Sequence, residues 1–334
     1  MTAARARQDI LTKPQGSLGR LETLSIQLAG ITGQALPRVA RKAVIVLAGD
    51  HGIAAEGVSA YPSEVTAQMV LNFLRGGAAI NVLARQAGAR VVIADVGVAA
   101  ELPEHPDLLN RKIAPGTANF AQGPAMSRQQ AIRSLQVGFE ILSDQAAQGL
   151  DLAATGEMGI GNTTPASAIT AIYTGLPVGQ VTGRGTGVDD AGLDLKIGTI
   201  ERALAFHQPD PTDPLGVLSA VGGFEIGAIA GVCLGAAVHR LPILVDGFIS
   251  AAGALIAAAL CPGVKPYLIA SHLSVERGHT ALWQAMGLDP LLDIDLRLGE
   301  GTGAVLAMHL VEAACRILSE MATFDDAGIS GPQA

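Results

Sequence analysis

A repeated pattern, in which an apolar segment ends in a polar, glycine-rich turn, constrains the fold of this chain most. Residues 43–48 (AVIVLA) and 91–94 (VVIA) are continuous apolar runs, typical of strands buried on both faces of a parallel sheet. Similar runs precede further turns, and the six turns read GDHG, DVG, GEMGIGNTT, DGF, SHLS and GEG. In doubly wound sheets such turns meet at the ligand-binding edge. We therefore predict an α/β fold with a doubly wound, mainly parallel sheet and helices on both faces.

The composition indicates closely packed helices and a large buried surface. Hydrophobic residues make up 49% of the 334 residues, yet only 16% are charged, against about 25% in an average soluble chain. Alanine and glycine supply much of the apolar content, and a buried dimer interface would reduce the charged surface that the chain needs. We therefore expect a homodimer. The net charge of −8 and the absence of a basic run argue against a nucleic-acid partner.

Neither a membrane span nor a secretory signal is predicted. The uncharged apolar stretch of residues 247–264 contains three glycines and a proline, and spanning helices need about 20 strongly apolar residues. The first residues are polar, so we expect a cytoplasmic protein. Cys233, Cys261 and Cys315 lie far apart in apolar settings and are predicted to be buried thiols. No Cys or His cluster has metal-ligand spacing, so no metal is expected.

The turn Gly299-Glu300-Gly301 places a single carboxylate among glycines. Apolar residues alternate with charged ones over residues 292–298, which predicts a strand, and residues 304–317 read as a helix that Thr302 is placed to cap. A helix amino end favours negative charge, and glycine allows a ligand to approach the backbone. An isolated turn of this kind is also compatible with a glutamate that faces water. The repetition of strand-to-helix turns favours a site at Glu300.

The segment 156–165 (GEMGIGNTTP) combines Glu157 with glycines and hydroxyls before a predicted helix. Free backbone amides there can bind a phosphate, although the segment is neither a Walker loop nor a dinucleotide fingerprint. A second glycine loop spans residues 182–187, and Arg184 and Lys196 are the cations expected nearby. Two carboxylates beside a phosphate loop point to chemistry on a phosphorylated sugar.

The loop of residues 13–20 (KPQGSLGR) allows two interpretations. It is either a connection between two helices or a further phosphate contact through Lys13 and Arg20.

Long motifs along nearly the whole chain resemble one family, the nicotinate-nucleotide:dimethylbenzimidazole phosphoribosyltransferases. In chain order the motifs are KPQGSLGRLE, GDHGIAAEGVSAYP, GEMGIGNTTPA, VGGFEIGAIAG, DGFISAAGAL, PYLIASHLSVERGH and LRLGEGTGA. The resemblance implies transfer of phosphoribose from nicotinate mononucleotide to dimethylbenzimidazole, with formation of α-ribazole phosphate and nicotinate for the lower ligand of cobalamin. It also implies a homodimer that needs no metal or redox cofactor.

The resemblance also carries over site residues and a domain organisation. It implies that Glu300 is the catalytic base and Glu157 the second glutamate of the site. The implied substrate-binding residues are Gly159, Gly185, Lys196 and Ser274 for the phosphate, Asp246 and Phe248 for nicotinate, and Tyr61, Met69 and Leu298 for the acceptor ring. Residues 1–36 and 304–334 would form a small helical domain, and residues 37–303 a large Rossmann-like catalytic domain.

Two other classes of function stay open from the residues alone. An N-glycosidase that uses water as the acceptor needs a narrow polar pocket, whereas Tyr61, Met69 and Leu298 favour an apolar one. A non-catalytic protein that binds aromatic bases would keep the pocket and tolerate the loss of Glu300.

Overall fold

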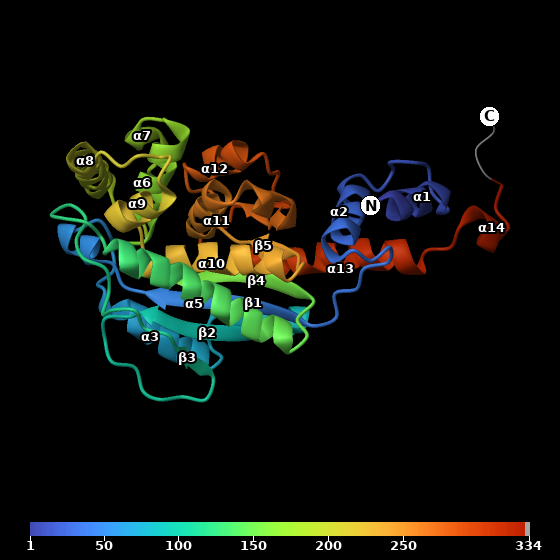
Figure 1. Cartoon of the computed structure of the whole chain (residues 1–334), viewed down its shortest axis with the longest axis horizontal. Coiled ribbons are helices and arrows are strands. Elements are labelled where there is room, and N and C mark those ends of the chain that lie inside the picture. The colour runs from blue at the N-terminus through green and yellow to red at the C-terminus, as the bar shows by residue number, and fades with distance from the viewer. Residues whose placement is uncertain (331–334) are drawn as a thin grey trace.

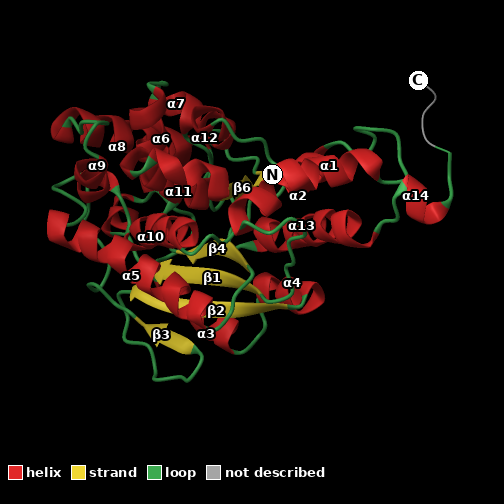
Figure 2. Ribbon diagram, turned by 45° about the vertical axis from the view of Figure 1, so that its right-hand side comes forward, coloured by secondary structure: helices red, strands yellow, loops and turns green. Residues whose placement is uncertain are grey.

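The computed structural model describes residues 1–330, and a parallel six-stranded sheet forms its centre. The strand order is β3-β2-β1-β4-β5-β6, and every neighbouring pair is parallel. The strands, yellow in Figure 2, are β1 (Lys42–Gly49), β2 (Ala89–Gly97), β3 (Leu108–Asn110), β4 (Leu152–Met158), β5 (Ile243–Val245) and β6 (Leu268–Ala270). The predicted fold class, a doubly wound α/β sheet, is therefore confirmed.

Helices cover both faces of the sheet because its central strands are apolar on both sides. Ile45 and Leu47 of β1 belong to one core cluster, and the alternating Val44 and Val46 belong to another. The helices of the first core include α5 (Arg128–Ala147), α10 (Phe224–Val238) and α11 (Phe248–Leu260). Those of the second are α2 (Arg20–Thr32), α3 (Glu64–Leu74), α4 (Ala79–Ala87) and α13 (Thr302–Glu320).

Glycine brings the helices α5 and α10 into unusually close contact. A Cβ atom at Gly138 would overlap the carbonyl oxygen of Ala228, and one at Gly231 would overlap that of Leu135. The backbones of the two helices therefore touch, which only glycine permits at these positions. The glycine and alanine content of the sequence reflects this kind of packing.

A group of further helices lies beyond the carboxyl ends of the strands, on the side of α11 (Figure 1). It consists of α6 (Thr163–Thr174), α7 (Val178–Val181), α8 (Asp190–His207), α9 (Pro214–Val221) and α12 (His279–Met286). Two short 3₁₀ helices, η1 (Gly52–Glu56) and η2 (Pro262–Tyr267), complete the connections.

The two ends of the chain form a helical arm that projects from the sheet (Figures 1 and 2). It contains α1 (Thr2–Ile10), α2, the end of α13 and α14 (Phe324–Ala327). A small apolar cluster of Ala4, Ile26, Ala29 and Leu318 holds it together. The first half of α13 belongs instead to the second core of the sheet, through Val305 and Met308. The division of the chain into two domains at residue 303 stays a prediction.

Several local predictions were wrong. The strand expected over residues 292–298 is limited to β8 (Leu292–Asp293), which pairs with β7 (His272–Leu273) in a separate two-stranded sheet. Of the alternating apolar residues that suggested it, Leu292 packs against the second core, but Ile294 is 50% exposed and Leu298 57%. The edge strand β3 was not among the strands predicted from apolar runs in the sequence.

Two predictions about single side chains also need correction. Thr302 does not cap α13, because its hydroxyl donates to the carbonyl oxygen of Gly299 at 2.9 Å. Cys233 and Cys315 are buried thiols as expected, but Cys261 is exposed because it follows the last turn of α11.

Within residues 1–330, α13 alone is long and apolar enough to cross a membrane. More than half of the apolar stretch of this helix is buried inside the fold, where it contributes to the second core of the sheet. A buried core helix accounts for this composition.

Candidate active site

A cavity of about 640 Å³ lies beside the carboxyl ends of the central strands. Nine of the eleven predicted site residues line it: Tyr61, Met69, Glu157, Gly159, Gly185, Phe248, Ser274, Leu298 and Glu300. The other two, Lys196 and Asp246, are fully buried behind its wall. Segments that are far apart in the sequence thus converge on one cavity, as expected for the ligand edge of a doubly wound sheet.

Glu300 lies at the centre of a strained turn. Gly299, Glu300 and Gly301 all have positive φ, and Glu300 has φ +62°, a conformation that side chains other than glycine rarely adopt. Its Oε2 atom accepts a hydrogen bond of 3.2 Å from the backbone amide of Ile80, in the first turn of α4. Burial raises the pKa of the Glu300 carboxyl, and the negative charge of Asp246 raises it further. Strain of this kind at a cavity wall is typical of a functional position.

Glu157, at the end of β4, lies directly against this turn. A Cβ atom at Gly299 would overlap its Oε1 atom, so only glycine fits there. Asn162 donates to Oε2 of Glu157 at 2.5 Å. Burial, together with the charge of Asp246, raises the pKa of Glu157 to about 8. Glu157 is therefore mainly neutral at pH 7, which leaves Glu300 as the better candidate for a base.

Asp246, at the end of β5, holds the Glu300 turn from behind. Its Oδ2 atom accepts from the amide of Gly301 at 3.1 Å, and its Oδ1 atom accepts from the amide of Ala304 at 2.8 Å. The carboxylate thus supplies the helix cap that Thr302 was expected to provide. The side chain is fully buried, and both of its oxygens accept hydrogen bonds from protein backbone.

The predicted phosphate-binding end contains a buried cation. The Nζ atom of Lys196 donates to the Thr163 hydroxyl at 2.6 Å and to the Gly183 carbonyl at 3.5 Å. Burial lowers the pKa of Lys196 to about 8, and the charge of Glu276 opposes this shift. An anion in the neighbouring cavity would favour the charged form of this lysine.

Sequence reasoning missed a second cation at this end of the cavity. Arg297 lines the cavity and donates to the carbonyl of Gly185 at 3.2 Å. Arg184, the expected cation, instead pairs with Asp190 on the surface.

Further cavity residues were not identified from the sequence, namely Val65, Asn162, Thr163, His272, Glu276, Asp295 and Arg297. Asn162 and Thr163 belong to the phosphate-type loop, and that loop was the only signal that pointed to them. His272 follows β6 in the SHLS turn, which was expected at the ligand edge and supplied Ser274, but the histidine itself was not assigned a role in the site.

The loop of residues 13–20 lies outside the cavity lining, which favours its structural interpretation. Lys13 pairs with Glu22 at 2.8 Å, and Arg20 donates to the carbonyls of Asp289, at 2.6 Å, and Pro290. The ion pair lies within the arm, and the hydrogen bonds of Arg20 fasten the arm to the large body of the protein.

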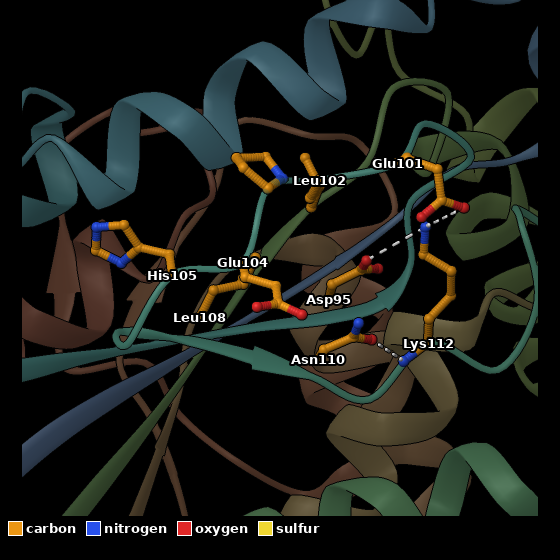
Figure 3. A pocket seen from close by; sticks show the side chains of 9 residues that line it. Asp95, Glu101, Leu102, Glu104, His105, Leu108, Asn110 and Lys112 are labelled. Atoms are coloured by element: carbon orange, nitrogen blue, oxygen red, sulfur yellow. Dashed lines mark hydrogen bonds and ion pairs between the residues drawn. The ribbon is translucent and has the colours of Figure 1, made fainter.

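A smaller cavity of about 180 Å³ lies beyond β2 and β3 (Figure 3). Lys112 lies within 3.6 Å of the Asp95 carboxylate and 3.8 Å of the Glu101 carboxylate. Asp95 also accepts from the amides of Gly97 and Val98. The aspartate of the DVG turn, expected at the ligand edge, therefore accepts from the backbone and takes part in an ion pair.

Over residues 1–330, no group of three or more His, Cys, Asp or Glu side chains is arranged to hold a metal ion.

Two carboxylates whose pKa values are raised by burial lie next to a loop suited to phosphate, and together they indicate an enzyme site for a phosphorylated sugar. The chain belongs to the phosphoribosyltransferase family, because the sequence model of that family matches residues 1–329. Among curated relatives, a nicotinate-nucleotide–dimethylbenzimidazole phosphoribosyltransferase of Roseiflexus sp. (strain RS-1) is 64% identical to this chain. The matched region covers 98% of this chain and 93% of the relative's chain. The enzyme of the same name from Desulforudis audaxviator is 61% identical and covers 99% and 94%. The crystal structure of CobT from Thermus thermophilus superimposes with a TM-score of 0.96 at 54% identity, covering 99% of both chains.

Proposed function

We propose that the protein transfers phosphoribose from nicotinate mononucleotide to dimethylbenzimidazole, giving α-ribazole 5'-phosphate and nicotinate for the lower ligand of cobalamin. The names of the relatives support this reaction. The observation that carries the proposal is that Glu300 and Glu157 share one cavity while burial pushes the pKa of Glu157 to about 8. One carboxylate is thus available as a base and the other as a hydrogen-bond donor.

The chemistry needs one base and no general acid. The bond between the sugar C1' atom and the pyridinium nitrogen breaks, and its electron pair stays on the departing nicotinate ring. One ring nitrogen of the acceptor attacks C1' from the opposite face, which converts a β-nucleotide into an α-product. The other ring nitrogen loses its proton to Glu300. A positioned carboxylate accepts such a proton efficiently when its pKa is raised toward the working pH, as burial does here.

The other residues bind and orient the substrates. Neutral Glu157, held by Asn162, donates a hydrogen bond to the reacting groups. The backbone around Gly159 and Gly185, with Ser274 and the buried Lys196, receives the phosphate.

The apolar side chains divide between the two rings. Tyr61, Met69 and Leu298 pack on the acceptor ring, and Phe248 packs on nicotinate. Asp246, predicted from the sequence for the nicotinate region, contributes by orienting the Glu300 turn.

Incubation of the purified protein with nicotinate mononucleotide, with and without dimethylbenzimidazole, tests the proposal. We expect nicotinate and a new nucleotide in equal amounts only when the base is present. Release of nicotinate without the base would identify an N-glycosidase. Binding of both compounds with no product in either reaction would identify a non-catalytic binding protein.

We also propose that the protein is a cytoplasmic homodimer that acts on small molecules. The charged fraction of 16% and the projecting arm of terminal helices support an additional buried surface (Figure 1). A monomeric mass in light scattering at micromolar concentration would contradict the dimer.

A further inference from the structure

We infer that His272 is a substrate-binding residue whose Nε2 atom accepts a hydrogen bond from a ribose hydroxyl of the nucleotide. The inference rests on the proposed function. His272 is only 2% exposed, yet it lines the cavity. Its backbone is fixed by pairing of β7 with β8 and by the indole Nε1 atom of Trp283, which donates to the His272 carbonyl at 3.2 Å.

The contacts of the Nδ1 atom determine which ring nitrogen carries the proton. Nδ1 lies 3.1 Å from the hydroxyl oxygen of Ser271 and 3.7 Å from the Asp246 carboxylate. The Ser271 hydroxyl donates its own proton to the carbonyl of Val245 at 2.7 Å. Toward His272 this hydroxyl oxygen therefore only accepts, so Nδ1 must be the N–H donor. A neutral His272 consequently has its lone pair on Nε2.

The opposite edge of the ring has no partner in the protein. The Nδ1 side packs on Gly303, where a Cβ atom would overlap the ring, so this side faces the start of α13. A Cβ atom at Gly247, which lines the cavity, would lie 3.6 Å from Cε1 and 3.7 Å from Nε2 of the same ring, so the Nε2 atom is on the Gly247 side. No hydrogen bond joins Nε2 to any side chain or backbone group of residues 1–330. An acceptor that has no protein partner and lies at a cavity wall is available to a donor from a ligand or water.

The substrates offer few donors of this kind. At neutral pH the nicotinate carboxylate only accepts and the phosphate is an anion, whereas both ribose hydroxyls can donate. The N–H group of the acceptor base is directed to Glu300 under the proposed mechanism. His272 lies two residues before Ser274, on the phosphate side, and contacts Gly303, three residues after Glu300. It is therefore placed between the ends that receive phosphate and base, where the ribose must lie.

Substrate analogues test this contact directly. We would measure kcat/KM for nicotinate mononucleotide and its 2'-deoxy and 3'-deoxy forms, at saturating dimethylbenzimidazole, in the wild type and in His272→Phe. The variant keeps a ring but removes the lone pair, so we expect a loss of about 5- to 20-fold with the parent nucleotide. With one of the two deoxy analogues, kcat/KM of the wild type should fall by the same factor relative to the parent nucleotide. For that analogue, kcat/KM of His272→Phe should equal that of the wild type. His239→Phe, which alters a partly exposed histidine at the end of α10, is the matched control and should behave like the wild type.

Equal losses for His272→Phe with all three nucleotides would overturn the inference, because the histidine would then not bind a ribose hydroxyl. If thermal melting shows that His272→Phe is unfolded, His272→Gln replaces it, since its amide oxygen keeps an acceptor and should restore discrimination against one deoxy analogue. Should the wild type show no turnover, the proposed reaction fails. Dissociation constants of the same three nucleotides, measured by calorimetry for the wild type and His272→Phe, then decide the role of His272. A ribose contact predicts weaker binding of one deoxy analogue by the wild type only.

Discussion

The carboxylate of Asp246 binds the backbone amide of Gly301, the residue that follows Glu300, across 3.1 Å. Its second oxygen binds the amide of Ala304 across 2.8 Å. One buried side chain thus fixes both the start of α13 and the strained turn that presents Glu300 to the cavity. Orientation of the candidate base depends on a residue that need not touch substrate.

Replacement of Asp246 by Asn places the side-chain NH₂ group, a donor, against one of the two backbone N–H groups that the carboxylate oxygens now accept from. We expect kcat to fall by about 10- to 100-fold with little change in KM, because the turn is misaligned while the binding residues remain. The free energy of unfolding should drop by about 1–3 kcal/mol through the unpaired buried donor. Steady-state kinetics and thermal melting check both effects. A raised KM for nicotinate mononucleotide at unchanged kcat would instead show that Asp246 contacts the substrate directly, as the sequence suggested.

Glu300→Gln tests the base itself. The variant keeps the shape and one acceptor oxygen but cannot take a proton, so kcat should fall by about 10²–10⁴-fold. In the wild type, kcat should decline on acidification through the raised pKa of Glu300, since the protonated carboxyl is inactive. Measurement of kcat as a function of pH checks this acidic decline. If folded Glu300→Gln keeps near-normal turnover, the proton leaves through another group, and Glu157 is the first candidate.

The positive φ of Glu300 predicts an unusual order of stability among its variants. Glu300→Ala and Glu300→Gly both lose the carboxylate and its bond to Ile80, so they differ mainly in backbone strain. Glycine adopts φ +62° freely, and we expect the Gly variant to be about 1 kcal/mol more stable than the Ala variant. Denaturant unfolding compares them. Equal stability, or a more stable Ala variant, would show that the turn stores no strain.

Glu157 should lower the stability of the fold at alkaline pH. A carboxyl with a raised pKa contributes stability that is present below its ordinary pKa of 4.5 and is lost as pH rises toward about 8. Glu157→Gln removes this dependence, so its melting temperature relative to the wild type should increase between pH 5 and pH 8. Melting curves across that range measure the difference. A constant difference would mean that Glu157 is ionised in the folded protein, and the donor role proposed for it would be wrong.

Lys196→Ala tests the phosphate contact. Loss of a charge-assisted interaction should raise KM for nicotinate mononucleotide by about 10- to 150-fold, equivalent to about 1.5–3 kcal/mol, and leave KM for dimethylbenzimidazole nearly unchanged. Initial rates with each substrate varied in turn provide the comparison. Equal changes for both substrates would indicate that Lys196 only supports the Thr163 loop.

The long apolar strands were predictable because burial on both faces imposes a continuous apolar run, as in β1 and in much of β2. The failed strand near residue 294 shows the limit of the same rule. Period-two alternation marks extended backbone, but whether that backbone pairs in a sheet depends on partners elsewhere in the chain. Leu298 alternates with charged residues because it lines a cavity, not because it faces a core. The three-residue strand β3 is too short to produce a pattern.

The candidate site was predictable where one turn carries the chemistry, as at Glu300 and Glu157. Contacts made between distant segments were not. The amide of Ile80, 220 positions from Glu300, has no side-chain signature, and the same holds for the tautomer that Ser271 imposes on His272. Asp246 was identified as a site residue from its motif, yet only the fold shows that both its oxygens bind backbone.

The helix α13 starts two residues after Glu300, passes through the second core of the sheet and ends in the arm beside α1. Its 19 residues form one rod about 28 Å long, so the two ends of the chain are not a detachable module. A protein shortened to residues 37–303 would lose Val305, Met308 and Val311 from beneath the sheet. The turn that presents Glu300, the candidate base, would then lose the helix that follows it. The arm of terminal helices is therefore connected rigidly to the turn that carries Glu300, although the two lie at opposite ends of the same helix.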